Sequence, residues 1–490
     1  MRILISIIAI LFTASYSQSQ INFFKLFSNS GDDIGEGIVQ LEDSSYVITG
    51  SSGSFVAQGG QAFLLHIDSV GNYIWSNHYG GAESDGGRRV MYNPDLGYYV
   101  AGYTNSMGAG GYDMYLFKTD LNGNLEWEKT FGGAGWERTH DVAFASDSGL
   151  IIVGETSSNP TEDVDAYIVR TDKNGDTLWT KTIGSLGGKD LIEAIAPLND
   201  SVFYCAGRIW IQDSSMYKAY VMRLHENGTV EFSDTLGPNG NYAFHELDIE
   251  LFNSQRIVLV GHNTGGTATE TDEYYARLNL DGSFQFEYTV TSNGFREARA
   301  ITHYGTPFKY YGCFENLDQW SHQDGVDVTI LKMNNAAMWE SNAFSVGYPL
   351  PDHMGEFIPT SDGGAICVGE TNSEGWEVGI NHVFVAKIGP GDVYPSMLTP
   401  HDIGDLVNTY EMPEITGIRI YPNPTNDELN IELESGAKMD VRIIDLTGNE
   451  VASKVANGSM KFSINYLQAG IYLVEVVSEG KSGVQRIVVN

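Results

Sequence analysis

The sequence predicts an all-β fold, in which a seven-bladed β-propeller is followed by a small C-terminal β-sandwich. Three observations support this prediction. A unit of four short apolar segments recurs about every 50 residues along most of the 490-residue chain. Gly, Asn and Asp bound these segments, and 56 glycines accompany 27 tyrosines and 22 phenylalanines. Units of this kind are typical of propeller blades, because one such sheet buries both faces only between neighbours in a ring.

The first 17 residues are predicted to be a secretory signal peptide. An arginine precedes an apolar run over residues 3–12, which is too short to span a bilayer as a stable helix. Small residues place the cleavage between Ser17 and Gln18, with cleavage after Ser19 as the alternative. We expect no transmembrane segment in the rest of the chain.

The composition excludes several classes of partner and site. The chain has 28 Lys and Arg against 63 Asp and Glu, a net charge of −35, so its surface repels phosphate backbones and we expect no nucleic-acid partner. The three cysteines, Cys205, Cys313 and Cys367, argue against a disulfide framework because their number is odd. Cys205 and Cys367 fall in apolar segments and are expected to be buried strand residues.

The propeller is predicted to span residues 20–392. Each blade is expected to contain four strands, for example DVAFAS from Asp141, LIIVGE from Leu150, AYIVRTD from Ala166 and TLWTKTIG from Thr177. We call these strands a, b, c and d. Gly and Asn between strands c and d predict tight hairpin turns.

An aromatic residue recurs in strand d and predicts the packing between blades. It is found at spacings of 52, 52, 53, 54 and 53 residues, at Trp75, Trp127, Trp179, Phe232, Phe286 and Trp339. In the first five units a basic residue in strand c precedes it by nine positions. We expect each of these aromatics, including Trp127, to be structural and to lie between neighbouring blades.

The two ends of the repeat region predict how the ring closes. The seventh unit stops after FVAKIGPGD and has no strand d of its own. Residues 21–28 resemble the strand d segments and precede the first unit. We therefore expect them to supply the outer strand of the last blade, which leaves no free sheet edge there.

A linker is predicted over residues 393–416, and a small β-sandwich over 417–490. Three motifs in this last part, YPNP, DLTGNEV and LQAGIYLVEV, resemble the type A sorting domain of the type IX secretion system. The resemblance rests on these residues: Tyr421, Pro422, Asn423, Pro424, Gly448, Gly470 and Tyr472. The alternative for this domain is a fibronectin-like stalk.

This resemblance implies a destination and a partner. A sorting domain of this type engages the type IX secretion machinery, is carried across the outer membrane and is then removed. The chain as a whole resembles secreted bacterial β-propeller surface proteins that carry such a domain. The resemblance therefore implies a secreted or cell-surface protein, either released or attached to surface lipopolysaccharide.

The search for catalytic motifs is negative. The segment HELDI lacks the second His of a zinc-binding HExxH motif, and no GxSxG or GxxxxGK segment occurs. We therefore expect no enzymatic activity and no cofactor.

One repeated pattern lies at the start of strand a, which is the innermost strand. Six of the seven residues at this place are acidic, and the set is Glu36, Arg89, Asp141, Glu193, Glu246, Glu297 and Glu356. These side chains are expected to ring one mouth of the central channel. Such a ring could hold a cation such as Ca²⁺. The alternative, which we favour, is that the carboxylates accept backbone N–H groups from adjacent loops.

The four tryptophans outside the repeated place form the candidate ligand site. They are Trp136, Trp210, Trp320 and Trp376, and they fall in d–a or b–c loops. Both kinds of loop emerge on the same face of an antiparallel blade, so we expect all four at one rim. Exposed aromatics on loops often mark recognition; the alternative is that each tryptophan caps its own blade.

These observations favour a non-catalytic binding protein whose ligand is a carbohydrate or another surface polymer. One alternative is a secreted polysaccharide-active enzyme that uses carboxylates at the rim. Another is a structural spacer without a ligand.

Overall fold

The computed structural model describes residues 23–489 apart from internal gaps. The gaps are 29–30, 54–59, 160–162, 213–215, 238–241, 253–255, 266–270, 291–295, 305–308, 317–326, 334–338, 347–351, 372–380, 390–402, 406–417, 422–424, 426–427, 434, 446–449, 466, 468–469 and 479–480. The predicted signal peptide and its cleavage site at Ser17 and Gln18 lie outside the described residues. All named elements are β-strands, and they fall into two compact units, Met1–Leu406 and Val407–Asn490.

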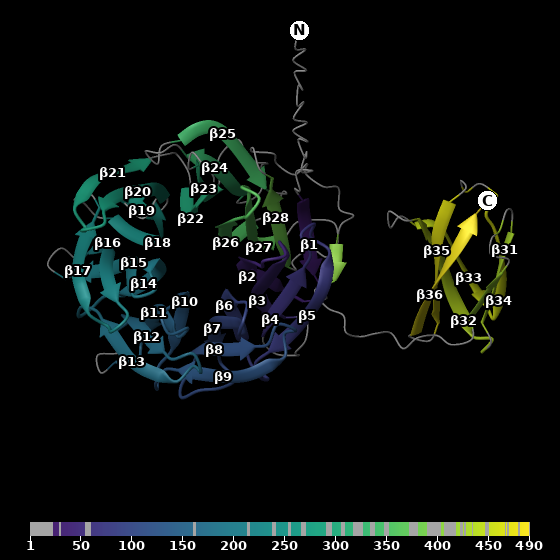
Figure 1. The fold of residues 1–490 in the computed structure, drawn as a ribbon, viewed down its shortest axis with the longest axis horizontal. Helices are drawn as coiled ribbons and strands as arrows, with labels where there is room; N and C mark the ends of the chain where they lie inside the picture. The colour runs from purple at the N-terminus through teal and green to yellow at the C-terminus, as the bar shows by residue number, and fades with distance from the viewer. Residues whose placement is uncertain are drawn as a thin grey trace, which may run out of the picture. The chain divides into compact units, whose positions relative to one another are not determined.

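Seven antiparallel sheets make up the first unit and circle a common axis, as Figure 1 shows. The first three blades, each in the order a to d, are β2 (Asp33–Gln40), β3 (Tyr46–Ser52), β4 (Gln61–Ile67) and β5 (Tyr73–Tyr79); β6 (Asp85–Asn93), β7 (Gly97–Thr104), β8 (Asp113–Thr119) and β9 (Leu125–Phe131); and β10 (Glu137–Phe144), β11 (Leu150–Thr156), β12 (Asp165–Thr171) and β13 (Thr177–Ile183).

The next three blades have the same order. They are β14 (Leu191–Asn199), β15 (Val202–Ile211), β16 (Met216–His225) and β17 (Val230–Leu236); β18 (Tyr242–Phe252), β19 (Arg256–Gly265), β20 (Thr271–Asn279) and β21 (Phe284–Val290); and β22 (Arg296–Tyr304), β23 (Lys309–Asn316), β24 (Asp327–Met333) and β25 (Trp339–Val346). The seventh comprises β26 (Asp352–Pro359), β27 (Ala365–Thr371), β28 (His382–Ile388), β1 (Phe23–Ser28) and β29 (Ile403–Asp405). The predicted seven-bladed propeller is confirmed.

The hydrophobic core lies between the blades. All seven residues of β11 are buried, because neighbouring blades cover both faces of this strand. The outer strand β13 alternates between exposed and half-buried residues, since solvent covers one of its faces. Apolar side chains of adjacent blades pack into shared clusters; Tyr99 and Leu116 of the second blade pack with Ile152 of the third. Cys205 and Cys367 are free and buried, as predicted, and the side chain of Cys313 is not described.

The recurring aromatic of strand d packs against the c–d hairpin of the next blade. Trp127 of β9 lies over Gly175, where a Cβ atom would be only 2.6 Å from Cζ3 of the indole. Gly175 has a φ of 78°, a conformation that glycine adopts without a steric penalty. The same contact recurs for Trp75 on Gly123, Trp179 on Gly228 and Phe232 on Gly282. The half-buried Trp127 is thus structural, as predicted.

The basic residue of strand c joins this aromatic to the a–b turn. Arg170 pairs directly with Trp179 across the β12–β13 ladder, and its Nη2 lies 2.6 Å from Oδ1 of Asp147. In the last blade, Nζ of Lys387 lies 2.9 Å from Oδ2 of Asp362. The repeated cation therefore fixes the turn at one edge of each of these blades.

Strand β1 closes the ring, as predicted. It runs antiparallel to β28, and Phe23 pairs with Lys387 as the recurring aromatics pair with their basic residues. The Phe23 ring also lies against Gly71, in the c–d hairpin of the first blade. The N-terminal strand thus supplies both the missing ladder and the missing contact between blades. Residues 403–405 lie within the segment predicted as a linker, and the structure adds them to this sheet as β29, parallel to β1.

The second unit is a two-sheet β-sandwich. Its strands are β30 (Ile418–Tyr421), β31 (Glu428–Leu433), β32 (Lys438–Asp445), β33 (Glu450–Asn457), β34 (Ser459–Ser463), β35 (Gly470–Ser478) and β36 (Lys481–Val489). One sheet has the order β30-β31-β34 and the other β33-β32-β35-β36. Alternate residues such as Ile431 and Val474 face a shared core between the two sheets. This matches the predicted β-sandwich.

Candidate functional site

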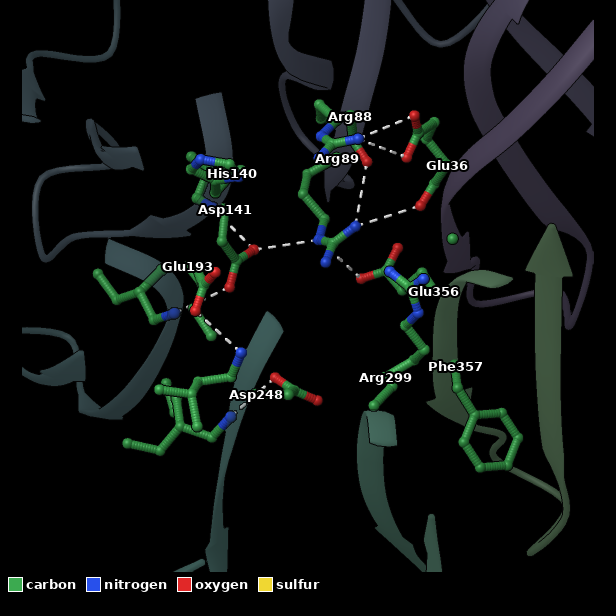
Figure 2. Close-up of a pocket in the computed structure, with 18 of the residues that line it drawn as sticks. Glu36, Arg88, Arg89, His140, Asp141, Glu193, Asp248, Arg299, Glu356 and Phe357 are labelled. Atoms are coloured by element: carbon green, nitrogen blue, oxygen red, sulfur yellow. Dashed lines mark hydrogen bonds and ion pairs between the residues drawn. The ribbon is translucent and has the colours of Figure 1, made fainter. Parts of the chain in front are cut away.

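The innermost strands of the propeller line a central cavity of about 980 Å³. The cavity is polar, and Figure 2 shows arginine and carboxylate side chains pointing into it from several blades. Its lining contains six Arg and Lys residues, Arg88, Arg89, Arg138, Lys189, Arg208 and Arg299. The lining also contains nine Asp and Glu residues, so the cavity is densely charged and holds both signs.

A β-bulge in every innermost strand determines which residues face the channel. The register of strand a shifts between Gly35 and Gly37 in the first blade, and between Gly87 and Arg89 in the second. Equivalent shifts occur in β10, β14, β18, β22 and β26. A bulge adds one residue and reorients the side chains beside it. Consecutive residues, such as Arg88 and Arg89, consequently both line the cavity.

Four channel carboxylates accept a hydrogen bond from the backbone of the next blade. The acceptors and donors are Asp141 and the Ile195 N–H at 2.9 Å, Glu193 and the Leu247 N–H at 2.9 Å, Asp248 and the Ile301 N–H at 2.8 Å, and Glu356 and the Ile38 N–H at 2.6 Å. These bonds join neighbouring innermost strands. The carboxylates thus hold the ring together around the channel, and the bonds run to strands rather than to loops.

Two arginines pair with three of the channel carboxylates. Arg88 donates to both carboxylate oxygens of Glu36, at 2.9 and 3.0 Å. Arg89 Nε donates to Asp141 at 3.2 Å and lies 3.7 Å from Glu356, so one guanidinium joins carboxylates of the third and seventh blades (Figure 2). Arg89 also donates to the carbonyl of Glu36 at 3.2 Å.

Burial perturbs the ionisation of the channel carboxyls. It raises the pKa of Asp248 to about 7, although the Ile301 N–H opposes the shift. It also raises the pKa of Glu356 to about 7 against the opposing charge of Arg89. The pKa of Glu193 is raised for the same reason. Removal from water disfavours the charged form of each carboxyl.

The predicted acidic ring is only partly formed by the predicted residues. Glu36, Asp141, Glu193 and Glu356 line the cavity, with Arg89 among them. The side chains of Glu246 and Glu297 lie outside the described part of the structure. Asp248, which the sequence analysis missed, faces the channel because the bulge in β18 lies between His245 and Asp248. No cluster of three or more His, Cys, Asp or Glu residues suited to a metal occurs among the described side chains.

Trp136, one of the four candidate tryptophans, directly precedes β10 and contacts two residues that line the cavity. The Arg138 guanidinium lies 5.1 Å from the centre of its indole, and the Lys189 ammonium lies 5.5 Å from it. Both cations line the cavity. Its backbone N–H donates to the hydroxyl of Ser157 at 2.8 Å, which fixes the loop that carries it. The indole is half-buried, so part of its surface faces solvent.

Trp210 lies at the same rim, near the end of β15. Its ring centre is 4.9 Å from that of Tyr217. Its Cβ lies so close to Gly188 that a Cβ atom added to this glycine would be only 2.0 Å away. Gly188 precedes Lys189, so one short segment contacts both tryptophans. The structure thus brings Trp136 and Trp210 together at the rim between the third and fourth blades. The remaining two candidates, Trp320 and Trp376, lie outside the described residues.

Lys189 links the rim to the channel. Its Nζ lies 3.1 Å from Oε2 of Glu155, and His140 Nε2 lies 3.7 Å from the other carboxylate oxygen. Burial alone would raise the pKa of Glu155, yet His140 and Lys189 hold it below its usual value. Glu155 is therefore an ionised carboxylate beneath the rim, with only 1% of its side chain exposed.

The C-terminal unit accounts for the destination of the protein. Residues 419–490 match the family model described as the secretion system C-terminal sorting domain. The chain carries a type IX sorting domain. The protein is therefore secreted or displayed on the cell surface, and it engages the type IX machinery through this domain.

The motifs of the sorting domain are partly visible in the structure. Tyr421 is 44% exposed at the end of β30 and donates a hydrogen bond to Glu432. Gly470 begins β35, and Tyr472 of the same strand is buried in the core of the sandwich. The other four motif residues, Pro422, Asn423, Pro424 and Gly448, lie in the gaps given above. The described part of the chain contains no helix with the length and apolarity needed to traverse a bilayer.

The chain is similar to several solved structures at low sequence identity. A fungal alcohol oxidase of the AA5 family in complex with copper has 12% identity and a TM-score of 0.47, over 95% of this chain and 98% of that chain. The Neurospora crassa Pan2 WD40 domain has 12% identity and a TM-score of 0.43, over 75% and 99%. The β-propeller domain of the Trilobed protease from Pyrococcus furiosus, with an open velcro topology, has 11% identity and a TM-score of 0.42, over 77% and 97%. No curated protein matches the sequence.

Proposed function

We propose that this secreted propeller binds a carbohydrate or another surface polymer without transforming it. The observation that carries the proposal is the pair of half-buried tryptophans, Trp136 and Trp210, at one rim beside the central cavity. A flat indole with one face partly in solvent offers a large apolar surface at a small cost in side-chain entropy. The polar cavity beside it supplies the hydrogen-bonding groups that a sugar needs.

Two alternative functions, an enzyme and a spacer, make different demands on the structure. A polysaccharide-active enzyme would need two carboxyls in one pocket with at least one raised pKa, and Asp248 and Glu356 meet that condition. However, each of these carboxyls accepts a backbone N–H of the next blade, at 2.8 and 2.6 Å. That contact supports a structural role. A spacer without a ligand would need neither the cavity nor the partly exposed aromatics beside it.

Binding of the full chain to a glycan array tests the proposal. We expect binding to a polysaccharide, and a loss of about tenfold or more when Trp136 and Trp210 are both replaced by Ala, because stacked aromatics dominate such contacts. The control is Phe284→Ala, which removes an aromatic that is 50% exposed at the start of strand d, near the c–d hairpin.

The outcomes separate the three functions. Equal binding by the wild-type protein and the Trp136→Ala/Trp210→Ala variant would refute a site at this rim. Release of reducing sugar from a bound polysaccharide, abolished by Glu356→Gln, would favour the enzyme. Absence of binding to every glycan on the array would favour the spacer.

A further inference from the structure

We propose that the rim between the third and fourth blades selects polysaccharides that carry negative charge, as uronates or sulfates. This inference rests on the proposed function and names the class of ligand for the same site. It follows from three cations that lie against Trp136 and against Tyr217, the neighbour of Trp210.

The first half of the rim site is an indole with two cations close to its ring. Arg138 and Lys189 lie 5.1 and 5.5 Å from the centre of the Trp136 ring. Arg138 is exposed, and within the described part of the chain its guanidinium contacts the Trp136 ring and forms no ion pair with a carboxylate. A guanidinium held by an indole stays ordered while its N–H groups remain available to an anion. Arg138 is thus placed to meet a carboxylate or sulfate group of a ligand.

The second half repeats this arrangement on the next blade. The Arg208 guanidinium lies 5.4 Å from the centre of the Tyr217 ring, and Tyr217 packs against Trp210. The backbone N–H of Lys189 donates to the Tyr217 hydroxyl at 3.1 Å. The segment that carries Lys189 therefore joins the two halves into one surface of three aromatics and three cations. These residues are Trp136, Trp210, Tyr217, Arg138, Lys189 and Arg208.

The distribution of charge favours an anionic ligand at this surface. Lys189 is 36% exposed in its side chain, whereas its partner Glu155 is 1% exposed and lies beneath it. Glu193, which the charge of Arg208 influences, already accepts the Leu247 N–H inside the channel. The rim thus presents cations to solvent and keeps these carboxylates behind them. In a chain with a net charge of −35, this group of cations lowers the local repulsion that a polyanion meets.

The aromatics distinguish a sugar from other anions. Charge alone would attract any polyanion, with a strong dependence on salt. A pyranose ring can also stack on an indole, as bases and sugars do on aromatic platforms. The site should therefore need both the charge and the ring of its ligand.

Binding of the full chain to matched polymers tests this inference. Dextran sulfate and uncharged dextran share one backbone, polygalacturonate carries uronates, and polyglutamate carries carboxylates without a sugar. We expect binding to dextran sulfate or polygalacturonate to exceed binding to dextran and polyglutamate by at least about tenfold. Replacing Arg138 by Gln should weaken the acidic-sugar binding about tenfold, the usual effect of losing one charged contact.

The first control is a cation of the third blade that lies away from the rim site. Lys173 is exposed in the c–d hairpin between β12 and β13, so Lys173→Gln removes the same charge away from the rim. It should leave binding unchanged. Lys189→Gln gives an independent loss at the rim, and circular dichroism confirms that each variant is folded.

The outcomes distinguish selection of acidic sugars from carbohydrate binding in general. Dextran bound as tightly as dextran sulfate would leave carbohydrate binding intact and overturn the selection of acidic sugars. Polyglutamate bound as tightly as the acidic sugars would also overturn it, since charge alone would then suffice. Wild-type affinity in both Arg138→Gln and Lys189→Gln would overturn the assignment of these cations. If the protein binds none of these polymers and no glycan on the array, the proposed function itself is overturned.

Discussion

The contact between Trp127 and Gly175 provides a quantitative test of how the blades are joined. Gly175 has a φ of 78°, and a Cβ atom there would lie 2.6 and 2.7 Å from two ring carbons of Trp127. An L-residue in this backbone conformation costs about 1–2 kcal/mol. Overpacking adds about 1–3 kcal/mol, and the half-buried indole can relax partly toward solvent, so we expect the lower half of that range. Gly175→Ala should therefore destabilise the propeller by about 2–4 kcal/mol.

A second glycine separates backbone strain from the clash. Gly363 has a φ of 81°, and no atom lies within 4 Å of the place where its Cβ would be. Gly363→Ala should cost only the strain, about 1–2 kcal/mol. The free energies of unfolding come from urea titrations followed by circular dichroism. Gly175→Ala made in a Trp127→Ala background should cost no more than Gly363→Ala, because the indole that it meets is gone.

Two outcomes would contradict a clash between Trp127 and a side chain at position 175. Equal destabilisation by Gly175→Ala and Gly363→Ala would show that the aromatic does not press on the hairpin. An unchanged cost of Gly175→Ala after removal of Trp127 would show the same. Either outcome would remove the main physical explanation for the recurrence of this aromatic in successive blades.

Three further predictions concern the ring. Deletion of residues 21–28 removes the outer strand of the last blade and should lower the melting temperature; an unchanged value would contradict closure by β1. The pKa of Glu356 is raised to about 7 by burial, so its contribution to stability is full below about pH 4 and is lost as the pH rises to about 7. Urea titrations between pH 5 and 7 should give a smaller fall in stability for Glu356→Gln than for the wild type, and equal slopes would disprove this. Arg89→Met leaves the carboxylates of Asp141 and Glu356 without their shared cation and should cost about 3–5 kcal/mol at pH 8. A loss below about 1 kcal/mol in the same titration would show that Arg89 does not stabilise the ring.

Much of the fold follows from the repeat, because a sheet of constant length is defined by local alternation and turn chemistry. The spacing of Trp75, Trp127 and Trp179 predicts the blades, and the missing strand d of the seventh unit predicts the closure by β1. The register of the closing strand against β28 is less evident from the sequence. Phe23 takes the place of the recurring aromatic opposite Lys387, although the sequence around it lacks the preceding turn.

The channel could be predicted only in outline, and the reason is the β-bulge. Alternation along strand a predicts one inward residue at each place, whereas the bulge turns consecutive residues such as Arg88 and Arg89 toward the cavity. A bulge also makes Asp248 a channel residue, which the spacing of the other acids did not indicate. The ion pairs between acids and arginines of different blades depend on distances between side chains, and a sequence pattern does not contain these distances.

The rim was partly predictable for a different reason. Strand order decides the face on which a loop emerges, so the sequence indicates that Trp136 and Trp210 share a rim. It does not indicate their neighbours. Lys189 is far from Trp136 in the sequence and reaches its ring only because the third and fourth blades are adjacent. Contacts between blades of this kind require the three-dimensional structure.

The parallel pairing of β29 with β1 joins the two ends of the propeller chain in one sheet. Ile403 to Asp405 pair with Leu26 to Ser28, so the N-terminal strand and a segment that precedes the sorting domain are neighbours in one sheet. If the sorting domain were cleaved off, only a cut beyond Asp405 would leave the pairing of β29 with β1 intact. A cut between Ile388 and Ile403 would separate β29 from the propeller. The edge of β1 would then be free to pair with a strand of another molecule.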